Sequence, residues 1–156
     1  MKTLRDLLDV AIQQEINSQD LYRKGLKVIK DPESQKFLKE LVKEEEEHEK
    51  MLYNIKETGL YDLDVVVKDD SIFKSGESSH DVQDEAFKED WTMEEILNLA
   101  LKREYRANQI FVAASKTARD TELITLLKNL AEEEINHHKN IEKKYKIQTG
   151  SFGPEI

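Results

Sequence analysis

The chain contains no cysteine, and this absence removes several classes of site at once. Disulfides, zinc ribbons, iron–sulfur centres and thiol catalysis are all excluded within this sequence. A chain without cysteine fits a reducing compartment, and we therefore expect a cytoplasmic protein.

Long apolar runs and an excess of positive charge are also missing. No segment approaches the ~20 apolar residues that a membrane-spanning helix needs, and the first residues, MKTLRDLLDVAIQQE, do not resemble a signal peptide. The 33 acidic and 24 basic residues give a formal net charge of −9, which argues against a nucleic-acid partner. We expect neither a membrane nor a nucleic acid as a partner.

Proline and glycine are scarce, with two and five residues among 156, so long uninterrupted helices are possible. Apolar residues recur with the helical period in four segments, and three of these begin with the helix-capping residues Thr3, Asp31 and Thr92. The predicted helices cover residues 3–28, 31–57, 92–118 and 121–145. We therefore expect an all-α protein with a single domain over residues 1–156.

The lengths of the connections predict how the helices are arranged. The joints near residues 30 and 119 are short, which favours two antiparallel hairpins, while the connection over residues 58–91 is long and holds a brief β-like run at 65–67. A loop of that length needs a reason. The simplest is that it crosses the length of the bundle, ~39 Å for a 26-residue helix. The sequence thus predicts an antiparallel four-helix bundle with a long crossover between the second and third helices.

An internal repeat is the most informative positive feature of the sequence. Glu15 recurs as Glu104, Glu45 as Glu134 and His48 as His137, each 89 residues further along the chain. Each half therefore carries a lone Glu on its first helix and a Glu-x-x-His unit on its second. This is the set of ligands that holds two adjacent metal ions inside a four-helix bundle.

All six repeated residues fall on the apolar stripe of their predicted helix. Four buried carboxylates would be untenable together without compensation, whereas two divalent cations would neutralise them. A ligand set rich in oxygen and free of sulfur suits iron, with manganese or a mixed pair as alternatives. The other interpretation, that acidic runs are solvated helix faces, explains much of the run 44–47 but not the recurrence on the stripe.

The pattern Glu, Glu-x-x-His, Glu, Glu-x-x-His resembles the ferritin-like di-iron carboxylate proteins, and within them it is most similar to the rubrerythrin branch. The resemblance implies that Glu15, Glu45 and His48 hold one iron and that the three residues of the second half hold the other. Glu45 and Glu134 would bridge the two ions. It also implies a homodimer.

The same resemblance implies roles for neighbouring residues. Glu44 and Glu133 precede the Glu-x-x-His units, where an acid fixes the outer nitrogen of the opposite His in similar bundles; plain surface charge is the alternative. Two departures from the family stand out. Ala107 occupies the place of a second acid on the third helix, which puts redox-linked ligand exchange in doubt. The family's small iron–sulfur domain needs cysteine, so the electron donor would be a separate protein.

Tyr22 follows Glu15 by two helical turns on the same stripe, and its hydroxyl could bond a metal-bound carboxylate. The alternative is an ordinary core aromatic. The repeat places Phe111 in the equivalent position, so we expect the two metal sites to differ. The remaining histidines, His80 and His138, are expected at the surface.

Three functions are compatible with this pattern. The first is a di-iron oxidoreductase that reduces peroxide or dioxygen, with Tyr22 as the candidate catalytic residue. The second is ferritin-type iron oxidation and storage, and the third is a non-catalytic metal-binding protein.

Overall fold

The computed structural model describes residues 1–74 and 90–149, without the side chains of 148 and 149. The described part contains four long helices, and their order confirms the predicted all-α bundle. The helices are α1 (Leu4–Val28), α2 (Pro32–Glu57), α4 (Met93–Thr117) and α5 (Thr121–Thr149). The last of them runs four residues past the predicted end at Tyr145, because neither glycine nor proline interrupts the sequence before Gly150.

The predicted caps begin the helices as expected. Thr3 forms a capping box in which its amide donates to Asp6 at 2.8 Å and its hydroxyl accepts from the Asp6 amide. Thr92 and Glu95 form the same motif at the start of α4. Each motif satisfies amides at a helix start that have no partner within the helix.

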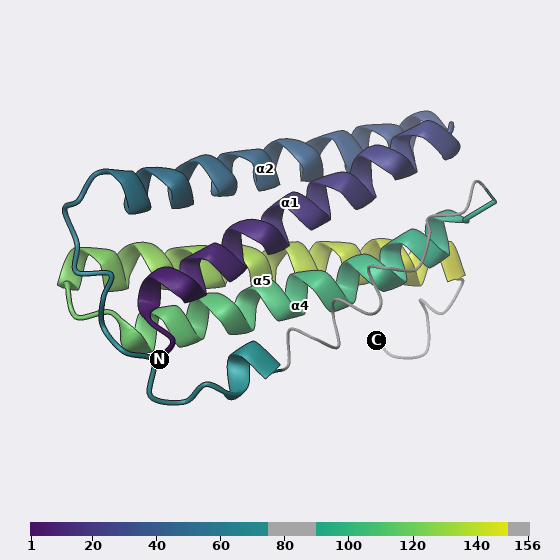
Figure 1. Ribbon diagram of the computed structural model, residues 1–156. Coiled ribbons are helices and arrows are strands. Elements are labelled where there is room, and N and C mark those ends of the chain that lie inside the picture. Colours follow the sequence, from purple (N-terminus) through teal and green to yellow (C-terminus); the bar gives the residue numbers. More distant parts are fainter. Residues whose placement is uncertain (75–89, 150–156) are drawn as a thin grey trace.

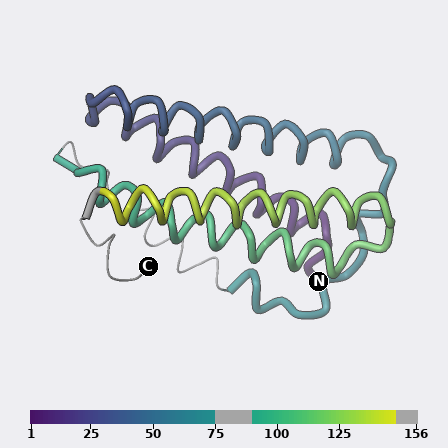
Figure 2. The backbone as a smooth tube through the Cα atoms, turned by 180° about the vertical axis from the view of Figure 1, so that it is seen from behind, coloured from purple at the N-terminus to yellow at the C-terminus, as the bar shows by residue number. Residues whose placement is uncertain are grey.

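The four helices form two antiparallel hairpins that lie side by side (Figure 1). Helix α1 pairs with α2, α4 pairs with α5, and α1 packs against α4 across the two hairpins. Seen from behind, α4 begins at the end of the bundle opposite to the end of α2 (Figure 2). The long connection therefore joins opposite ends of the molecule, as its length predicts.

The first part of the crossover forms hydrogen bonds with the start of α1. The amide of Leu4 donates to the Val65 carbonyl at 2.8 Å, and the amide of Arg5 donates to the Leu63 carbonyl at 2.9 Å. An isolated antiparallel bridge joins Thr3 to Val66. The β-like run at 65–67 thus forms an isolated bridge, and the carbonyls of Val65 and Leu63 accept from amides that have no partner within the helix.

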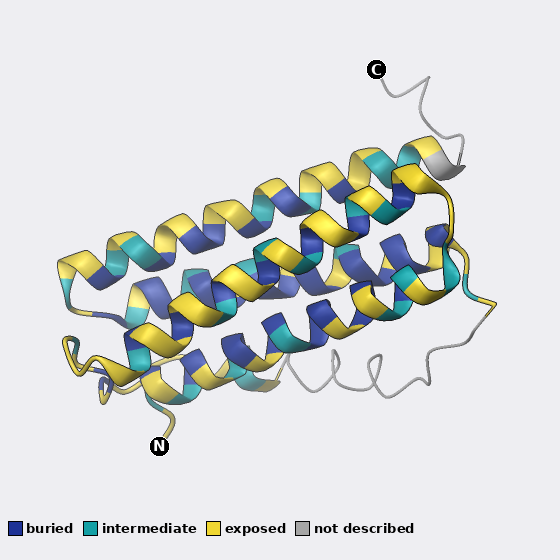
Figure 3. Cartoon of the chain, turned by 90° about the horizontal axis from the view of Figure 1, so that it is seen from above, coloured by how far each residue is buried: buried dark blue, intermediate teal, exposed yellow. Residues whose placement is uncertain are grey.

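The apolar interior is divided into two clusters. One is built around Leu8, Leu52 and Phe111, and the other around Leu38, Leu97 and Ile141. Buried residues line the inner face of each helix, while the outer faces are exposed (Figure 3). The repeated Glu and His residues belong to neither cluster, because they form a polar layer in the bundle interior.

One of the sequence predictions lies outside the described residues, because His80 belongs to the segment 75–89. Within the described ranges, no helix combines the length and the apolar character needed to cross a bilayer.

The contribution of the N-cap of α4 to the stability of the fold can be measured directly. Thr92→Ala removes the acceptor for the Glu95 amide and should lower the free energy of unfolding of the metal-free protein by about 1 kcal/mol. Thr125→Ala is the matched control, since this exposed hydroxyl only bonds the Thr121 carbonyl of its own helix. Urea unfolding followed by circular dichroism measures both, and equal losses for the two variants would contradict the capping role.

Candidate metal centre

The six repeated residues come together in the middle of the bundle. They are drawn from all four helices, and each is at most 8% exposed: Glu15, Glu45, His48, Glu104, Glu134 and His137. In each hairpin, the lone Glu and the Glu-x-x-His unit lie at the same height along the bundle. This follows because the two helices run in opposite directions from a short joint.

The six residues form two overlapping groups that could each hold a metal ion. Glu15, Glu45, His48 and Glu134 form one group, and the second group consists of Glu45, Glu104, Glu134 and His137. Within each group, one potential ligand atom from every residue lies within 4.8 Å of all the others. Glu45 and Glu134 occur in both groups, which is the placement that bridging carboxylates require.

The two histidines direct one ring nitrogen inward and the other toward the surface. His48 Nδ1 lies 2.6 Å from Glu134 Oε1, and its Nε2 lies 2.6 Å from Glu133 Oε2. His137 Nδ1 lies 3.1 Å from Glu45 Oε1, and its Nε2 lies 2.5 Å from Glu44 Oε2. The Nδ1 atoms are therefore the ones that face the carboxylate oxygens.

Glu44 and Glu133 are thus more than surface charges. Each reaches from one hairpin to the His of the other, while its own side chain stays about half exposed at 46% and 55%. The two imidazole rings stack with centroids 5.5 Å apart and planes inclined by 12°. A carboxylate on the outer nitrogen fixes the tautomer and the orientation of an imidazole ligand, so these acids pre-orient both rings.

Tyr22 is buried, and its hydroxyl donates a hydrogen bond to Glu104 Oε1 at 2.6 Å. The contact joins α1 to α4 and so links the two hairpins through the cluster. Phe111, the equivalent residue in the second half, is equally buried and carries no hydroxyl. Of the two alternatives that the sequence left open for Tyr22, the structure shows a hydroxyl bonded to a carboxylate of the cluster.

Unpartnered oxygens show that the cluster is suited to cations. Both carboxylate oxygens of Glu15, together with Oε2 of Glu104 and Oε2 of Glu134, are buried and have no hydrogen-bond partner in the part of the chain that the structure describes. A buried acceptor without a donor is costly, and a buried charge without a partner is costlier. Two divalent cations would bind these oxygens and balance four carboxylates, so the residues fit the binuclear centre that their pattern predicts.

When no cation is bound, protons neutralise part of the negative charge of the carboxylates. Burial raises the pKa of Glu15 and raises the pKa of Glu134 well above its ordinary value, with repulsion from Glu104 adding to the second shift. Burial also acts to raise the pKa of Glu104, but His137, Tyr22 and Glu134 stabilise its charged form and bring the pKa below its ordinary value.

The pKa values of the two histidines are also raised, which favours their positively charged forms. Burial alone would lower the pKa of His137, but Glu104 and Glu44 favour the charged imidazolium and raise this pKa to about 10. Burial also acts to lower the pKa of His48, but Glu15 and Glu133 favour its charged form and raise this pKa above its ordinary value. Protons and metal ions therefore compete for the same atoms.

Sequence reasoning missed the buried polar residues that directly precede the lone Glu on α1 and on α4. Gln14 donates to the Arg103 carbonyl at 3.2 Å, and the Arg103 guanidinium donates to the Asn17 carbonyl at 2.5 Å. Gln14 and Arg103 occupy equivalent positions of the 89-residue repeat, but their residue types differ, so the sequence carries no signal for this contact. His138, expected at the surface, is partly exposed and packs its ring 6.1 Å from that of Tyr105.

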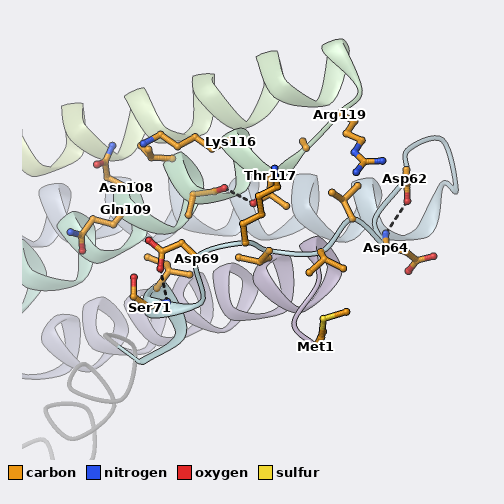
Figure 4. A pocket seen from close by; sticks show the side chains of 18 residues that line it. Met1, Asp62, Asp64, Asp69, Ser71, Asn108, Gln109, Lys116, Thr117 and Arg119 are labelled. Atoms are coloured by element: carbon orange, nitrogen blue, oxygen red, sulfur yellow. Dashed lines mark hydrogen bonds between the residues drawn. The ribbon is translucent and has the colours of Figure 1, made fainter.

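A groove of about 1140 Å³ lies apart from this centre (Figure 4). It runs between residues 62–72 of the crossover and the C-terminal half of α4, with Asn108, Lys116 and Arg119 along one side. None of the six repeated residues lines it. The metal-binding chemistry and this groove are therefore separate features.

Comparisons with known proteins agree with the pattern of the site. The rubrerythrin family profile matches residues 6–84, just over half of the chain. A crystal structure of a candidate ferritin-like diiron-carboxylate protein from Thermotoga maritima superposes with a TM-score of 0.73 at 18% sequence identity, covering 93% of this chain and 95% of that one. At this identity the structural match supports the fold. The curated protein sequences gave no match.

Because Glu45 and Glu134 belong to both groups, the number of metal ions bound per chain directly tests the proposed binuclear centre. Metal-free protein incubated with Fe(II) or Co(II) should retain two ions per chain by elemental analysis after desalting. Glu45→Ala and Glu134→Ala each remove a ligand common to both groups and should retain at most one.

Glu47→Ala removes an exposed acid from the same helical run and should retain two ions. Two retained ions in either of the shared-ligand variants would show that the ions bind elsewhere.

Proposed function

This chain belongs to the rubrerythrin family, and we propose that it is a di-iron oxidoreductase that reduces peroxide or dioxygen at the buried cluster. The observation that carries the proposal is the buried constellation itself. Four carboxylates and two imidazoles face one another in the bundle, with several carboxylate oxygens left without a donor among the described residues.

The proposed ligands divide into two sets with shared members. Glu15 and His48 would hold one iron, Glu104 and His137 the other, and Glu45 and Glu134 would bridge them. When bound, two ferrous ions would supply the two electrons and the Lewis acidity that cleavage of a peroxide O–O bond requires. Manganese or a mixed pair is an alternative compatible with the same ligands.

The chain's own side chains prepare this site. Glu133 and Glu44 hold the outer nitrogens of His48 and His137, which keeps both Nδ1 atoms directed inward. Because these two acids are about half exposed, they also mark where the cluster comes nearest to solvent, between α2 and α5. A small oxidant would approach from that side.

Tyr22 is the candidate catalytic residue. Burial raises the pKa of its phenol well above the ordinary value, and the neighbouring Glu104 adds to the shift. The phenol therefore keeps its proton at neutral pH and holds it at the edge of the cluster, against Glu104 Oε1. Reduction of peroxide to water consumes protons as well as electrons, and this hydroxyl is placed to donate one.

Two partners complete the proposal. The electrons for repeated turnover would come from a separate donor protein, since the cysteine-free chain offers no thiolate site for an iron–sulfur centre. A second copy of the chain, forming a homodimer, follows from the family resemblance. Iron storage would instead require a hollow multimeric shell.

The proposed activity predicts a reaction of the ferrous protein with peroxide. Anaerobic Fe(II)-loaded protein mixed with hydrogen peroxide should oxidise faster than the same concentration of free Fe(II), as measured by stopped-flow absorbance. Tyr22→Phe should slow this oxidation by about 10–100-fold, the usual effect of removing a partner of a metal ligand. Glu47→Ala should react like the unchanged protein.

The result that would overturn the proposed activity is a loaded protein that oxidises no faster than free Fe(II). Such a protein could still bind two ions, and the non-catalytic alternative would then stand.

The size of the assembly in solution distinguishes the proposed reductase from the iron-storage alternative. Size-exclusion chromatography with light scattering should give the mass of a dimer, both without metal and after loading with iron and oxidation. A shell of many subunits that retains far more than two irons per chain would favour ferritin-type storage.

A further inference from the structure

The two halves of the cluster are related by the 89-residue repeat, and most of their contacts match. The outer nitrogen of His48 lies 2.6 Å from Glu133, and that of His137 lies 2.5 Å from Glu44. The separations between Nδ1 and the lone Glu of the same half are 3.7 Å for His48 and 3.6 Å for His137. The outer nitrogen and the lone Glu therefore lie at nearly the same distances from the ring in both halves. The inward nitrogen is closer to the opposite shared Glu for His48, at 2.6 Å, than for His137, at 3.1 Å.

The halves differ at the lone Glu. Glu104 Oε1 accepts the hydrogen bond from Tyr22 at 2.6 Å, which leaves Oε2 as its one oxygen without a hydrogen bond. Glu15 has no such donor among the residues described, because Phe111 stands where the repeat would place a second tyrosine, and neither of its oxygens has a hydrogen bond. One lone Glu is therefore held by a hydrogen bond across the helix interface, and its counterpart is not.

A ligand held in its binding orientation loses less conformational freedom when the metal binds. Buried hydrogen-bond partners of metal ligands contribute to affinity for this reason. Tyr22 is completely buried, so the bond to Glu104 is shielded from competing water. The half with Glu104 and His137 is therefore more pre-organised than the half with Glu15 and His48.

We propose that the two halves bind metal in sequence, with the Glu104–His137 half filling first and more tightly, and that Tyr22 is the positioning residue that sets this order. The proposal rests on the metal centre proposed above. It assigns Tyr22 a role in loading that is separate from proton donation during turnover. It also assigns Glu15 as the ligand whose carboxylate is free to reorient.

Titration of the metal-free protein with Co(II), followed by calorimetry and by visible absorption, tests the order without any turnover. The unchanged protein should show two binding steps of different affinity. Tyr22→Phe should weaken the first step by about 10–100-fold and bring the two steps together. Phe111→Tyr, which offers Glu15 the missing donor, should strengthen the second step instead.

Single-half variants identify which half fills first. His137→Ala should abolish the tight step and leave the weaker one, whereas His48→Ala should abolish the weaker one. Tyr53→Phe removes a hydroxyl from an exposed tyrosine and should leave both steps unchanged. Circular dichroism of each metal-free variant shows whether it is folded. If Tyr22→Phe does not fold, Phe111→Tyr still tests the proposed order of binding.

The failure of this inference is distinguishable from failure of the centre. A protein that binds no Co(II) would overturn the proposed centre itself. Two equal steps in the unchanged protein, a tight step that survives His137→Ala, or steps unaffected by either aromatic exchange would overturn the proposed order and leave the centre standing.

Discussion

The bundle is organised around one electrostatic constraint, which is that four carboxylates in its dry interior need positive charge beside them. Glu15, Glu45, Glu104 and Glu134 are each at most 1% exposed. Without metal, protons and two imidazoles provide part of the compensation, as the raised pKa values of Glu134 and His137 show. Two divalent cations would provide all of it, so metal binding and stability of the fold are expected to be linked.

The rest of the structure makes such a charged layer tolerable. The apolar interior is built as two clusters rather than one, so that hydrophobic burial is supplied by residues other than those of the site. The crossover contributes at one end, where its carbonyls accept from Leu4 and Arg5 and secure the start of α1. Long helices without internal proline then carry the ligands at one height.

The contacts around the site also join the two hairpins. Glu133 of α5 holds His48 of α2, Glu44 of α2 holds His137 of α5, and Tyr22 of α1 holds Glu104 of α4. Three of the six ligands are thus oriented by the opposite half of the repeat. A substitution at one of these partners would therefore affect metal geometry and hairpin docking together.

The sequence by itself determined the helices, their caps and the identity of the six clustered residues. Helical period and capping are local properties of the chain, and a repeat at a constant offset of 89 residues can be read directly from the order of the residues. It also indicated Tyr22 through its place on the stripe of Glu15. Only the tertiary structure decided that this hydroxyl reaches Glu104 rather than Glu15, that Nδ1 faces the carboxylates, and that Gln14 and Arg103 form a buried polar contact. These features depend on side-chain rotamers and on how the hairpins pack against each other, and spacing along one helix carries no information about either.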